Sequence, residues 1–425
     1  MFGHQLFMKE AGKIAARYAG EHRVFLFYAD IAEFRLINYF YGTKQGDELL
    51  LAVEGYLSQI PQVQLYERIF SDYFAFVVVT DAPRSDDALI ETYQRYADTF
   101  IAAQKEKYPA GNLKIYCGIC PLGENNLSET LDHANIARKQ ARESVVRTVV
   151  VFNRQMQKNL QTNIELEKEV NTCLWEKRFT FVLQPKVNML TGEIVGAEAL
   201  ARRVTPEGEI IYPDFFLSIM ERNGSIVDMD YLILEHVCVH MAERLRRGLP
   251  VVPTSVNLSL LHVLDESTAF RIHEIVQQYK VPARLLEFEL TETIFTEELA
   301  GAKRLVERLR NLHYSVAIDD FGSGYAGITL WQELDFNVLK LDRRFLSEEE
   351  PLCTRNQAIV PNIVNIAWKL DNTVICEGIE TYEQCQYMLN MGCTIAQGFY
   401  FSRAVPAEEF YQKYQEVSGY FPIFR

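Results

Sequence analysis

The sequence lacks the features of a membrane-spanning or secreted protein. No apolar run among its 425 residues is as long as a membrane-spanning helix, and no secretory signal opens the chain. The eight cysteines follow no disulfide spacing. Cys117 and Cys120 form a CxxC, but the strand-like run around them favours core cysteines over a redox or zinc site. We therefore expect a reduced, cytoplasmic protein with no membrane segment in this chain.

The chain is also short of positive charge. Its 43 Lys and Arg residues stand against 57 Asp and Glu residues, which gives a formal net charge of -14. A DNA or RNA duplex would need a basic face, so this balance argues against such a partner. It is compatible with carboxylates gathered around metal ions. The sequence has no HExxH, so His236 and His240 are interpreted as ordinary residues on a helix face.

The length and the order of the patterns predict two domains, because 425 residues exceed one ordinary core. Alternating strand and helix patterns predict an α+β sheet domain in residues 1–153. Its expected parts are a strand leading into a helix at 24–34, helices at 46–57 and 131–145, a hairpin at 66–79, and strands at 112–122 and 147–153. Residues 154–176 repeat apolar residues every four positions without Gly or Pro, which predicts a rigid helical linker.

Residues 177–425 show the pattern of a (β/α)8 barrel. Apolar strand-like runs recur, and helical segments separate most of them. The eight runs are residues 179–185, 194–202, 252–259, 285–292, 314–321, 337–342, 373–380 and 395–401. The expected fold class is α+β in the first domain and an α/β, TIM-like barrel in the second.

Polar residues end these runs, although a strand buried on both faces should stay apolar. They are Gln184, Glu198, Asn257, Glu289 with Glu292, Asp319 with Asp320, Lys340, Glu377 with Glu380, and Gln397. Any one of them could be a simple loop or capping residue. Their repetition at all eight runs instead predicts a functional site at the C-terminal mouth of the barrel, where barrel enzymes carry their chemistry.

The types of side chain indicate metal-dependent phosphodiester chemistry. The set offers hard oxygen ligands and no His or Cys, so Mg²⁺ or Mn²⁺ is favoured over zinc. One of the adjacent carboxylates Asp319 and Asp320 could bridge two cations while the other holds the second, and such a pair can clamp a phosphodiester for in-line attack. Lys340 could orient or activate the attacking water. Arg202, four residues after Glu198, could pair with a phosphate oxygen.

These segments resemble the EAL domain, a family of cyclic-di-GMP phosphodiesterases. The resemblance covers residues 180–405 through GAEALAR at 196–202, LQP at 183–185, SVNLS at 255–259, ELTE at 289–292, DDFGSGY at 319–325, LKLD at 339–342, EGIE at 377–380 and QGFYF at 397–401. It implies opening of one phosphodiester of cyclic di-GMP to give linear pGpG. It also implies a homodimer, because in the family the loop that carries Gly322 and Gly324 links the active site to dimer contacts.

The resemblance further implies a role for each site residue. The two-metal site, for Mg²⁺ or Mn²⁺, would be held by Glu198, Asn257, Glu289, Asp319, Asp320 and Glu377. The catalytic set would be Lys340 as the water-activating residue, Glu198, Glu377, and Glu292, which steadies the loop after the paired aspartates. The substrate-binding set would be Gln184, Arg202, Asp342, Glu380 and Gln397. Cys376 and Ala404 depart from the commoner Ala and Pro, but no metal or base position is lost.

The hairpin RIFSDYF at 68–74 lacks the Gly or Asn that hairpin turns usually carry. It resembles the GGDEF hairpin of diguanylate cyclases, with Phe70 and Ser71 at the two glycine positions and Tyr73 at the glutamate. Phe70 would block the approach of phosphate to the backbone, and Tyr73 is not an anion at neutral pH. Ala32 replaces a second acid of the metal strand. We therefore expect a degenerate, regulatory GGDEF-like domain that is not a cyclase.

Part of the nucleotide site is retained according to the same resemblance. Asn38 and Asp47 match the guanine-reading positions, and Asp30 and Asp72 match positions that hold a metal. GTP is therefore a candidate regulatory ligand. The other interpretation is that Asn38 and Asp47 are simple helix-start residues, since both residue types cap helices well.

The sequence leaves two other functions to compare with an active phosphodiesterase. The alternative is a non-catalytic cyclic-di-GMP receptor or scaffold, which the intact ligands and Lys340 disfavour. A bifunctional cyclase and phosphodiesterase is disfavoured by Phe70, Tyr73 and Ala32. The chain opens close to the first helix of the GGDEF-like domain, so we also expect that an upstream sensor or membrane segment could precede it in a longer protein.

Overall fold

The structure is a computed structural model of the chain. It describes residues 2–18, 22–81, 85–109, 113–122, 126–144, 146–322, 329–346 and 352–415. The chain forms two compact units, Met1–Ile164 and Glu165–Arg425. In the part of the chain that is described, no helix has both the length and the apolar character needed to cross a membrane.

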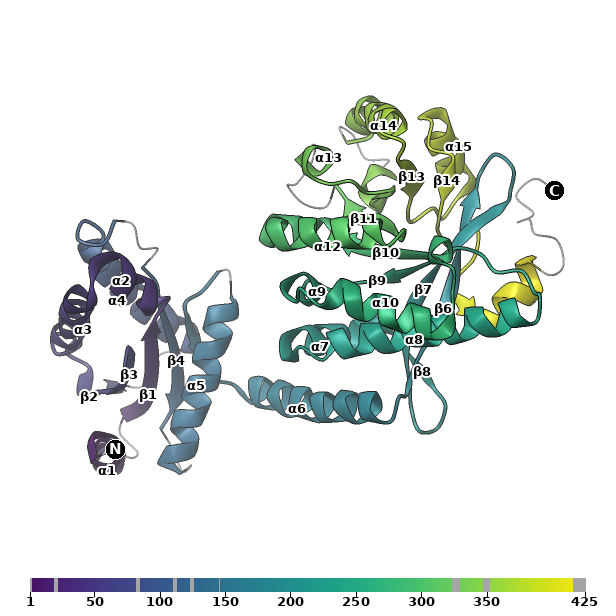
Figure 1. Cartoon of the computed structure of the whole chain (residues 1–425). Coiled ribbons are helices and arrows are strands. Elements are labelled where there is room, and N and C mark those ends of the chain that lie inside the picture. Colours follow the sequence, from purple (N-terminus) through teal and green to yellow (C-terminus); the bar gives the residue numbers. More distant parts are fainter. Residues whose placement is uncertain are drawn as a thin grey trace. The chain divides into compact units, whose positions relative to one another are not determined.

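The first unit is built on a five-stranded sheet (Figure 1). Its strands are β1 (His22–Ile31), β2 (Val63–Phe70), β3 (Tyr73–Asp81), β4 (Ile115–Pro121) and β5 (Val149–Val151), in the order β2-β3-β1-β4-β5. All neighbours are antiparallel except β4 and β5, which are parallel. The hairpin and the strands that the sequence predicts in this domain are therefore confirmed.

Helices cover both faces of this sheet because the side chains of β1 alternate between two apolar clusters. Phe25 and Phe27 pack with α2 (Phe34–Tyr41), α3 (Thr43–Leu57) and α4 (Asp86–Gln104). Val24 and Leu26 pack on the other face with α1 (Phe2–Arg17) and α5 (Leu127–Glu143). The sequence patterns do not predict α4. Cys117 and Cys120 are buried free thiols, as the strand-like run around them predicts.

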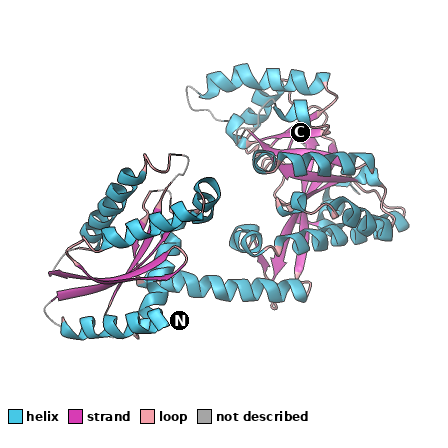
Figure 2. Ribbon diagram, turned by 60° about the vertical axis from the view of Figure 1, so that its left-hand side comes forward, coloured by secondary structure: helices cyan, strands magenta, loops and turns pink. Residues whose placement is uncertain are grey.

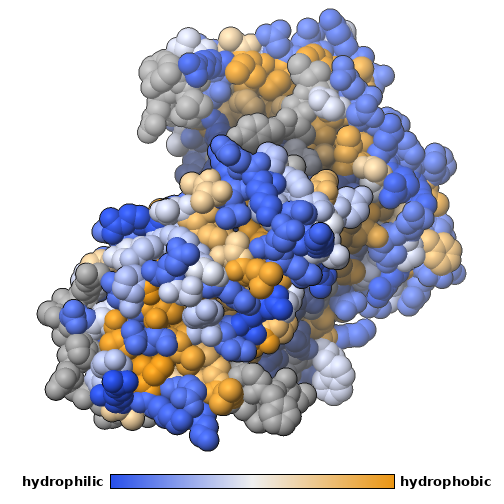
Figure 3. Space-filling view, turned by 90° about the vertical axis from the view of Figure 1, so that its left-hand side faces the viewer, coloured by the Kyte–Doolittle hydropathy of each residue, from blue (hydrophilic) through white to orange (hydrophobic). Residues whose placement is uncertain are grey.

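Large apolar side chains are also exposed on this unit. They include Leu36, Tyr39 and Phe40 of α2, Leu51 of α3, and Phe70 at the end of β2. Figure 3 looks onto this unit and shows apolar surface interspersed with hydrophilic surface. Scattered exposure of this kind is common on soluble proteins and carries no functional conclusion by itself.

Helix α6 (Arg154–Trp175) follows the first sheet without a Gly or Pro in its length. The boundary between the two compact units falls inside it, after Ile164. In its C-terminal half, Val170 and Cys173 are fully buried in the core of the second unit. Arg203 of the second unit ties this half down through an ion pair with Glu169, whose Oε1 lies 2.5 Å from Arg203 Nη1.

The second unit is a closed eight-stranded barrel, and Figure 2 shows helices around its strands. The strands are β6 (Phe179–Asn188), β7 (Ile194–Val204), β9 (Thr254–Asn257), β10 (Leu286–Thr291), β11 (Ser315–Phe321), β12 (Val338–Leu341), β13 (Thr373–Cys376) and β14 (Ile395–Ala396). The order is β6-β14-β13-β12-β11-β10-β9-β7, and β7 pairs back with β6. Two short strands, β8 (Ile210–Ile211) and β15 (Val405–Pro406), pair antiparallel with β7 and β6 respectively.

The helices of the barrel occur mainly between its strands. The α-helices are α7 (Leu217–Asn223), α8 (Ile226–Arg246), α9 (Leu261–Leu264), α10 (Thr268–Tyr279), α11 (Glu292–Glu297), α12 (Leu299–Asn311), α13 (Thr329–Glu333), α14 (Leu352–Lys369), α15 (Tyr382–Asn390) and α16 (Ala407–Phe410). Short turns of other helix types are η1 (Pro213–Phe215), η2 (Ala283–Leu285), η3 (Arg343–Leu346) and η4 (Tyr411–Gln415). His236 and His240 lie on α8, as predicted.

One feature of the barrel differs from the predicted pattern. β6 is antiparallel to both of its neighbours, whereas the other barrel strands are parallel to one another. Gln184 and Glu198 do not end their strands. Both lie inside long strands, directly opposite each other in the β6–β7 register. The assignment of these two residues to strand ends was wrong because β6 continues to Asn188 and β7 to Val204, past the point where the apolar runs break.

Candidate active site

Strand alternation turns the acidic residues into the barrel. In β10, Phe288 and Leu290 pack outward among the helices, so Glu287 and Glu289 point inward. A separate small apolar cluster of Ala317, Val338 and Ile375, with Ile395 beside it, lies on the inward faces of four other strands. Each next inward position along these strands is a polar residue of the predicted set, namely Asp319, Lys340, Glu377 and Gln397. On these four strands the polar residues therefore lie next to an apolar layer.

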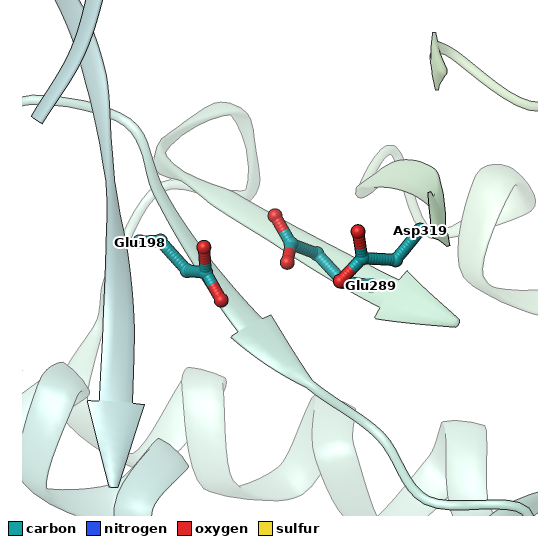
Figure 4. Close-up of side chains that lie close together, drawn as sticks. All are labelled: Glu198, Glu289 and Asp319. Carbon is teal, nitrogen blue, oxygen red and sulfur yellow. The ribbon is translucent and has the colours of Figure 1, made fainter. Parts of the chain in front are cut away.

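The carboxylates form two groups that share one member. Glu198, Glu289 and Asp319 have ligand oxygens within 4.8 Å of one another. Figure 4 shows these three side chains pointing toward one another from separate strands. Asp319, Asp320 and Glu377 form the second group within the same distance. Because Asp319 belongs to both groups, the arrangement suits two neighbouring cations with one bridging carboxylate.

Lys340 lies at the centre of these carboxylates and is fully buried. Its Nζ contacts Glu289 Oε2 at 2.6 Å, Glu377 Oε1 at 2.7 Å, Asp319 Oδ2 at 3.1 Å and Glu198 Oε2 at 3.3 Å. One ammonium group therefore neutralises part of a cluster that would otherwise be strongly repulsive.

Burial and charge shift the protonation of this cluster in opposite directions. Burial raises the pKa of Glu377 to about 8, against the lowering effect of Lys340. Burial would also raise the pKa of Glu289, but Lys186 and Lys340 beside it hold that pKa at about 2. Burial lowers the pKa of Lys340, and the surrounding carboxylates raise it well above its ordinary value. The cluster thus has a high affinity for positive charge.

Two amide side chains donate hydrogen bonds to the carboxylate of Glu198. Asn257 Nδ2 donates to Glu198 Oε1 at 3.0 Å, and Gln397 Nε2 donates to Glu198 Oε2 at 2.7 Å and to Gln184 Oε1 at 3.0 Å. Gln184 in turn donates to the carbonyl of Ser402 at 3.1 Å. These contacts hold the Glu198 carboxylate between two strands and explain how Gln184 reaches the site from the antiparallel strand β6.

The turn after β11 is held by side chains on both sides. Asp320 has a left-handed backbone with φ of 55°, and its N–H donates to Asp319 Oδ1 at 2.8 Å. Glu292 is buried, and its Oε2 accepts from the N–H of Gly322 at 2.8 Å. Glu292 thus fixes the start of the loop that follows the paired aspartates. Gly324, which the sequence analysis places in the same loop, lies outside the described residues.

A pocket opens over the carboxylates. Its lining residues are Gln184, Glu198, Asp319, Arg343, Glu377, Gly378, Glu380, Gln397, Gly398 and Phe399. Sequence reasoning missed Arg343 and Phe399 as pocket residues, although Arg343 directly follows Asp342 and Phe399 lies two residues after Gln397. Arg202 and Asp342 do not line the pocket. Arg202 lies over the ring of Tyr212 at 4.9 Å, and Asp342 accepts from the N–H of Arg344 at 2.8 Å.

Lys186 is a further residue that the sequence reasoning missed. It is buried on β6, and its Nζ lies 2.7 Å from Glu287 Oε1 and 2.9 Å from Glu289 Oε1. Its position directly after the LQP motif, which ends a predicted buried strand, could have indicated a buried lysine from the sequence.

In the first unit, aromatic rings and an arginine occupy the hairpin that resembles a cyclase site. Phe70 and Tyr73 flank a two-residue turn, and their rings stack 4.6 Å apart at 16°. Arg138 of α5 lies over Tyr73 at 5.0 Å, and its Nη1 is 2.8 Å from Asp30 Oδ1. Arg138 and Asp30 are both buried, and burial raises the pKa of Asp30 although Arg138 lowers it. The carboxylate of Asp30 already has a cationic partner.

The other predicted nucleotide residues are more open. Asp47 is exposed, and Asp72 is half-buried in the hairpin turn. Asn38 Oδ1 is buried without a hydrogen-bond partner in the described part of the chain. A Cβ atom on Gly46 would lie 1.9 Å from this oxygen, so the missing side chain of Gly46 leaves room for the Asn38 amide. Asn38 therefore lies beside the residue that precedes Asp47.

Comparison with known families agrees with this architecture. The EAL domain model matches residues 167–404, more than half of the chain. The model of the diguanylate cyclase GGDEF domain matches residues 3–146.

Named relatives and solved structures are similar over large parts of the chain. Cyclic di-GMP phosphodiesterase NbdA of Pseudomonas aeruginosa is 28% identical over 405 residues, which cover 91% of this chain and 50% of that protein. The bifunctional diguanylate cyclase/cyclic di-GMP phosphodiesterase MucR of the same organism is 26% identical over 391 residues, which cover 92% of this chain and 57% of that protein. The chain spans about half the length of the curated relatives it matches.

A solved structure of the MucR phosphodiesterase in complex with c-di-GMP is also similar. It has a TM-score of 0.53 and 29% identity, and the match covers 58% of this chain and 99% of that one. Together with the closed barrel and its ring of inward carboxylates, the family match shows that the chain belongs to the EAL domain family.

Proposed function

We propose that the chain is a metal-dependent phosphodiesterase that hydrolyses cyclic di-GMP to linear pGpG. The observation that carries this proposal is the pair of carboxylate groups sharing Asp319, with Lys340 among them, at a pocket that Glu198, Asp319 and Glu377 line. Water adds to one phosphorus and the P–O3′ bond breaks, which leaves a 5′-phosphate and a 3′-hydroxyl. The similarity to NbdA and to the c-di-GMP complex of MucR supports this substrate.

The residues present fit two divalent cations. All five carboxylates and Asn257 are oxygen donors, and the donor set favours Mg²⁺ or Mn²⁺ over softer metals. When bound, these ions would neutralise charge on the scissile phosphate and favour ionisation of the attacking water. We propose Glu198, Asn257, Glu289, Asp319, Asp320 and Glu377 as the residues that hold them.

The protein's own residues would prepare the reaction around these ions. Lys340 now uses the carboxylate oxygens that cations would need, so its ammonium must withdraw from some of them and becomes free to hold the attacking water. Gln184, Gln397 and Glu380 line the pocket and can bind the nucleotide, with Arg343 supplying a positive charge. Arg202 and Asp342, which lie outside the pocket lining, would need the bound substrate to reach them.

The proposal predicts formation of pGpG when the protein is incubated with cyclic di-GMP and Mg²⁺ or Mn²⁺, as followed by ion-exchange separation of nucleotides. EDTA should abolish the product, and Ca²⁺ should inhibit because its looser coordination misplaces the water. Glu198→Ala should remove most of the turnover. Binding of cyclic di-GMP without any pGpG would favour a non-catalytic receptor, and absence of binding would reject the substrate.

The shared carboxylate predicts a difference in metal stoichiometry. Asp319→Asn should lose both Mn²⁺ ions, because both carboxylate groups include Asp319, whereas Glu377→Gln should lose only one. Electron paramagnetic resonance of free Mn²⁺ during titration would count the bound ions. Asp335→Asn, an exposed carboxylate elsewhere on the barrel, is the matched control and should keep two. Loss of the same single ion in both site variants would contradict the bridging role.

Lys340→Ala should separate catalysis from binding. The turnover number should fall about 10²- to 10⁴-fold, the range expected when a group that serves proton transfer is removed. The affinity for cyclic di-GMP, measured with Ca²⁺ to suppress turnover, should stay within about threefold. Lys303→Ala is the control, since Lys303 is an exposed lysine paired with Glu333 on the outside of the barrel. Near-normal turnover in Lys340→Ala would remove this residue from the mechanism.

We also propose that the first unit is a regulatory domain that binds GTP without making cyclic di-GMP. The stacked rings of Phe70 and Tyr73 and the Arg138–Asp30 pair support the loss of cyclase chemistry. The unpartnered Asn38 oxygen and the exposed Asp47 support a retained guanine contact. The pairing of Asp30 leaves Asp72 as the more accessible of the two predicted metal residues.

A homodimer stays a prediction from the family resemblance, testable by light scattering.

GTP should raise the rate of pGpG formation about five- to thirtyfold, which corresponds to a coupling of about 1–2 kcal/mol. Linkage requires that GTP bind the active arrangement more tightly than the resting one. Calorimetry and rate measurements across a GTP titration would test this in the parent and in Asp47→Ala, which should lose both effects. Binding without a change in rate would reject the coupling, and no binding would leave the domain as a scaffold.

A further inference from the structure

A second buried lysine lies below the pocket floor. Lys186 and Gln184 are two apart on β6 and share one face of the strand, but only Gln184 lines the pocket. The Lys186 side chain is 5% exposed, and it is held between Glu287 and Glu289, the two inward carboxylates of β10. Its contacts are therefore to residues about a hundred positions later in the chain.

The strand that faces Lys186 carries a glycine. Lys186 pairs in register with Gly196 on β7. A Cβ atom on Gly196 would lie 3.0 Å from the carbonyl oxygen of Pro253, which is a tight approach, and 3.7 Å from Lys186 Cδ, which is an ordinary contact. The position of Lys186 is therefore set by its contacts with β10 and does not depend on the glycine.

The two oxygens of Glu289 are divided between two lysines. Oε1 lies 2.9 Å from Lys186 Nζ, and Oε2 lies 2.6 Å from Lys340 Nζ at the centre of the carboxylate cluster. Cations at the cluster would compete with Lys340 for Oε2. They would not compete with Lys186, which is below the cluster and is held a second time by Glu287.

We propose that Lys186 is a positioning residue that holds Oε1 of Glu289, so that Oε2 alone is presented to a metal ion. This inference rests on the metal site of the proposed function. Lys186 would keep a positive charge beside Glu289 with or without cations, whereas Lys340 would have to release Glu289 Oε2 when cations bind. Residues that orient a metal ligand in this way commonly change metal affinity 10- to 100-fold when they are replaced.

The test compares Mn²⁺ binding, measured by electron paramagnetic resonance without substrate, in three variants. Lys186→Met removes the charge and leaves Glu287 and Glu289 without their shared partner, so the protein could fail to fold. Lys186→Met combined with Glu287→Gln removes one of the two stranded carboxylates and keeps the test usable. Glu287→Gln alone retains the Lys186–Glu289 contact and is the matched control.

We expect both Lys186 variants that fold to bind Mn²⁺ about 10- to 100-fold more weakly, and the control to stay within about threefold of the parent. The Mn²⁺ concentration for half-maximal pGpG formation should shift in parallel, with the rate at saturating Mn²⁺ largely recovered. Parent-like Mn²⁺ affinity in the folded double variant would overturn the role of Lys186 and leave the metal site intact. A parent protein that binds no Mn²⁺ would overturn the metal site itself and this role with it.

Discussion

Buried negative charge is the constraint on which the second unit depends. Carboxylates inside a closed barrel are costly unless cations or hydrogen-bond donors compensate them. Lys340 forms ion pairs with four of them, and Lys186 forms a further ion pair with Glu289. The amides of Asn257 and Gln397 satisfy the oxygens of Glu198. The folded barrel therefore needs positive charge beside its buried carboxylates, and the proposed metal ions would meet the same need.

Because strand β6 is antiparallel to its neighbours, it places two of its polar side chains at defined levels of the barrel interior. It brings Gln184 to the level of Glu198 and Lys186 to the level of Gly196, one inward position lower. The polar interior therefore has two layers, with the pocket above and the Lys186–Glu287 pair below. Lys186 and Glu287 are not among the residues that line the pocket.

The same electrostatic rule accounts for the hairpin of the first unit. Asp30 is a buried carboxylate, and Arg138 gives it the cation that its burial requires. The guanidinium also lies over Tyr73, whose ring stacks on Phe70. Aromatic and cationic packing here stabilises a turn that has no glycine, with Ser71 in the left-handed region at φ of 49°. The two-residue turn between β2 and β3 therefore forms without a glycine.

The eight apolar runs and the polar residues that end them, including Glu289, Asp319 and Lys340, could be predicted from the sequence, because a strand buried on both faces should stay apolar and a polar residue at its end stands out. The direction of β6, the sharing of Asp319 between two groups and the contact of Lys186 with Glu289 could be seen only in the folded chain. An apolar run reads the same in either direction. Contacts between residues about a hundred positions apart, such as Lys186 and Glu289, depend on barrel closure and register, which no local pattern encodes.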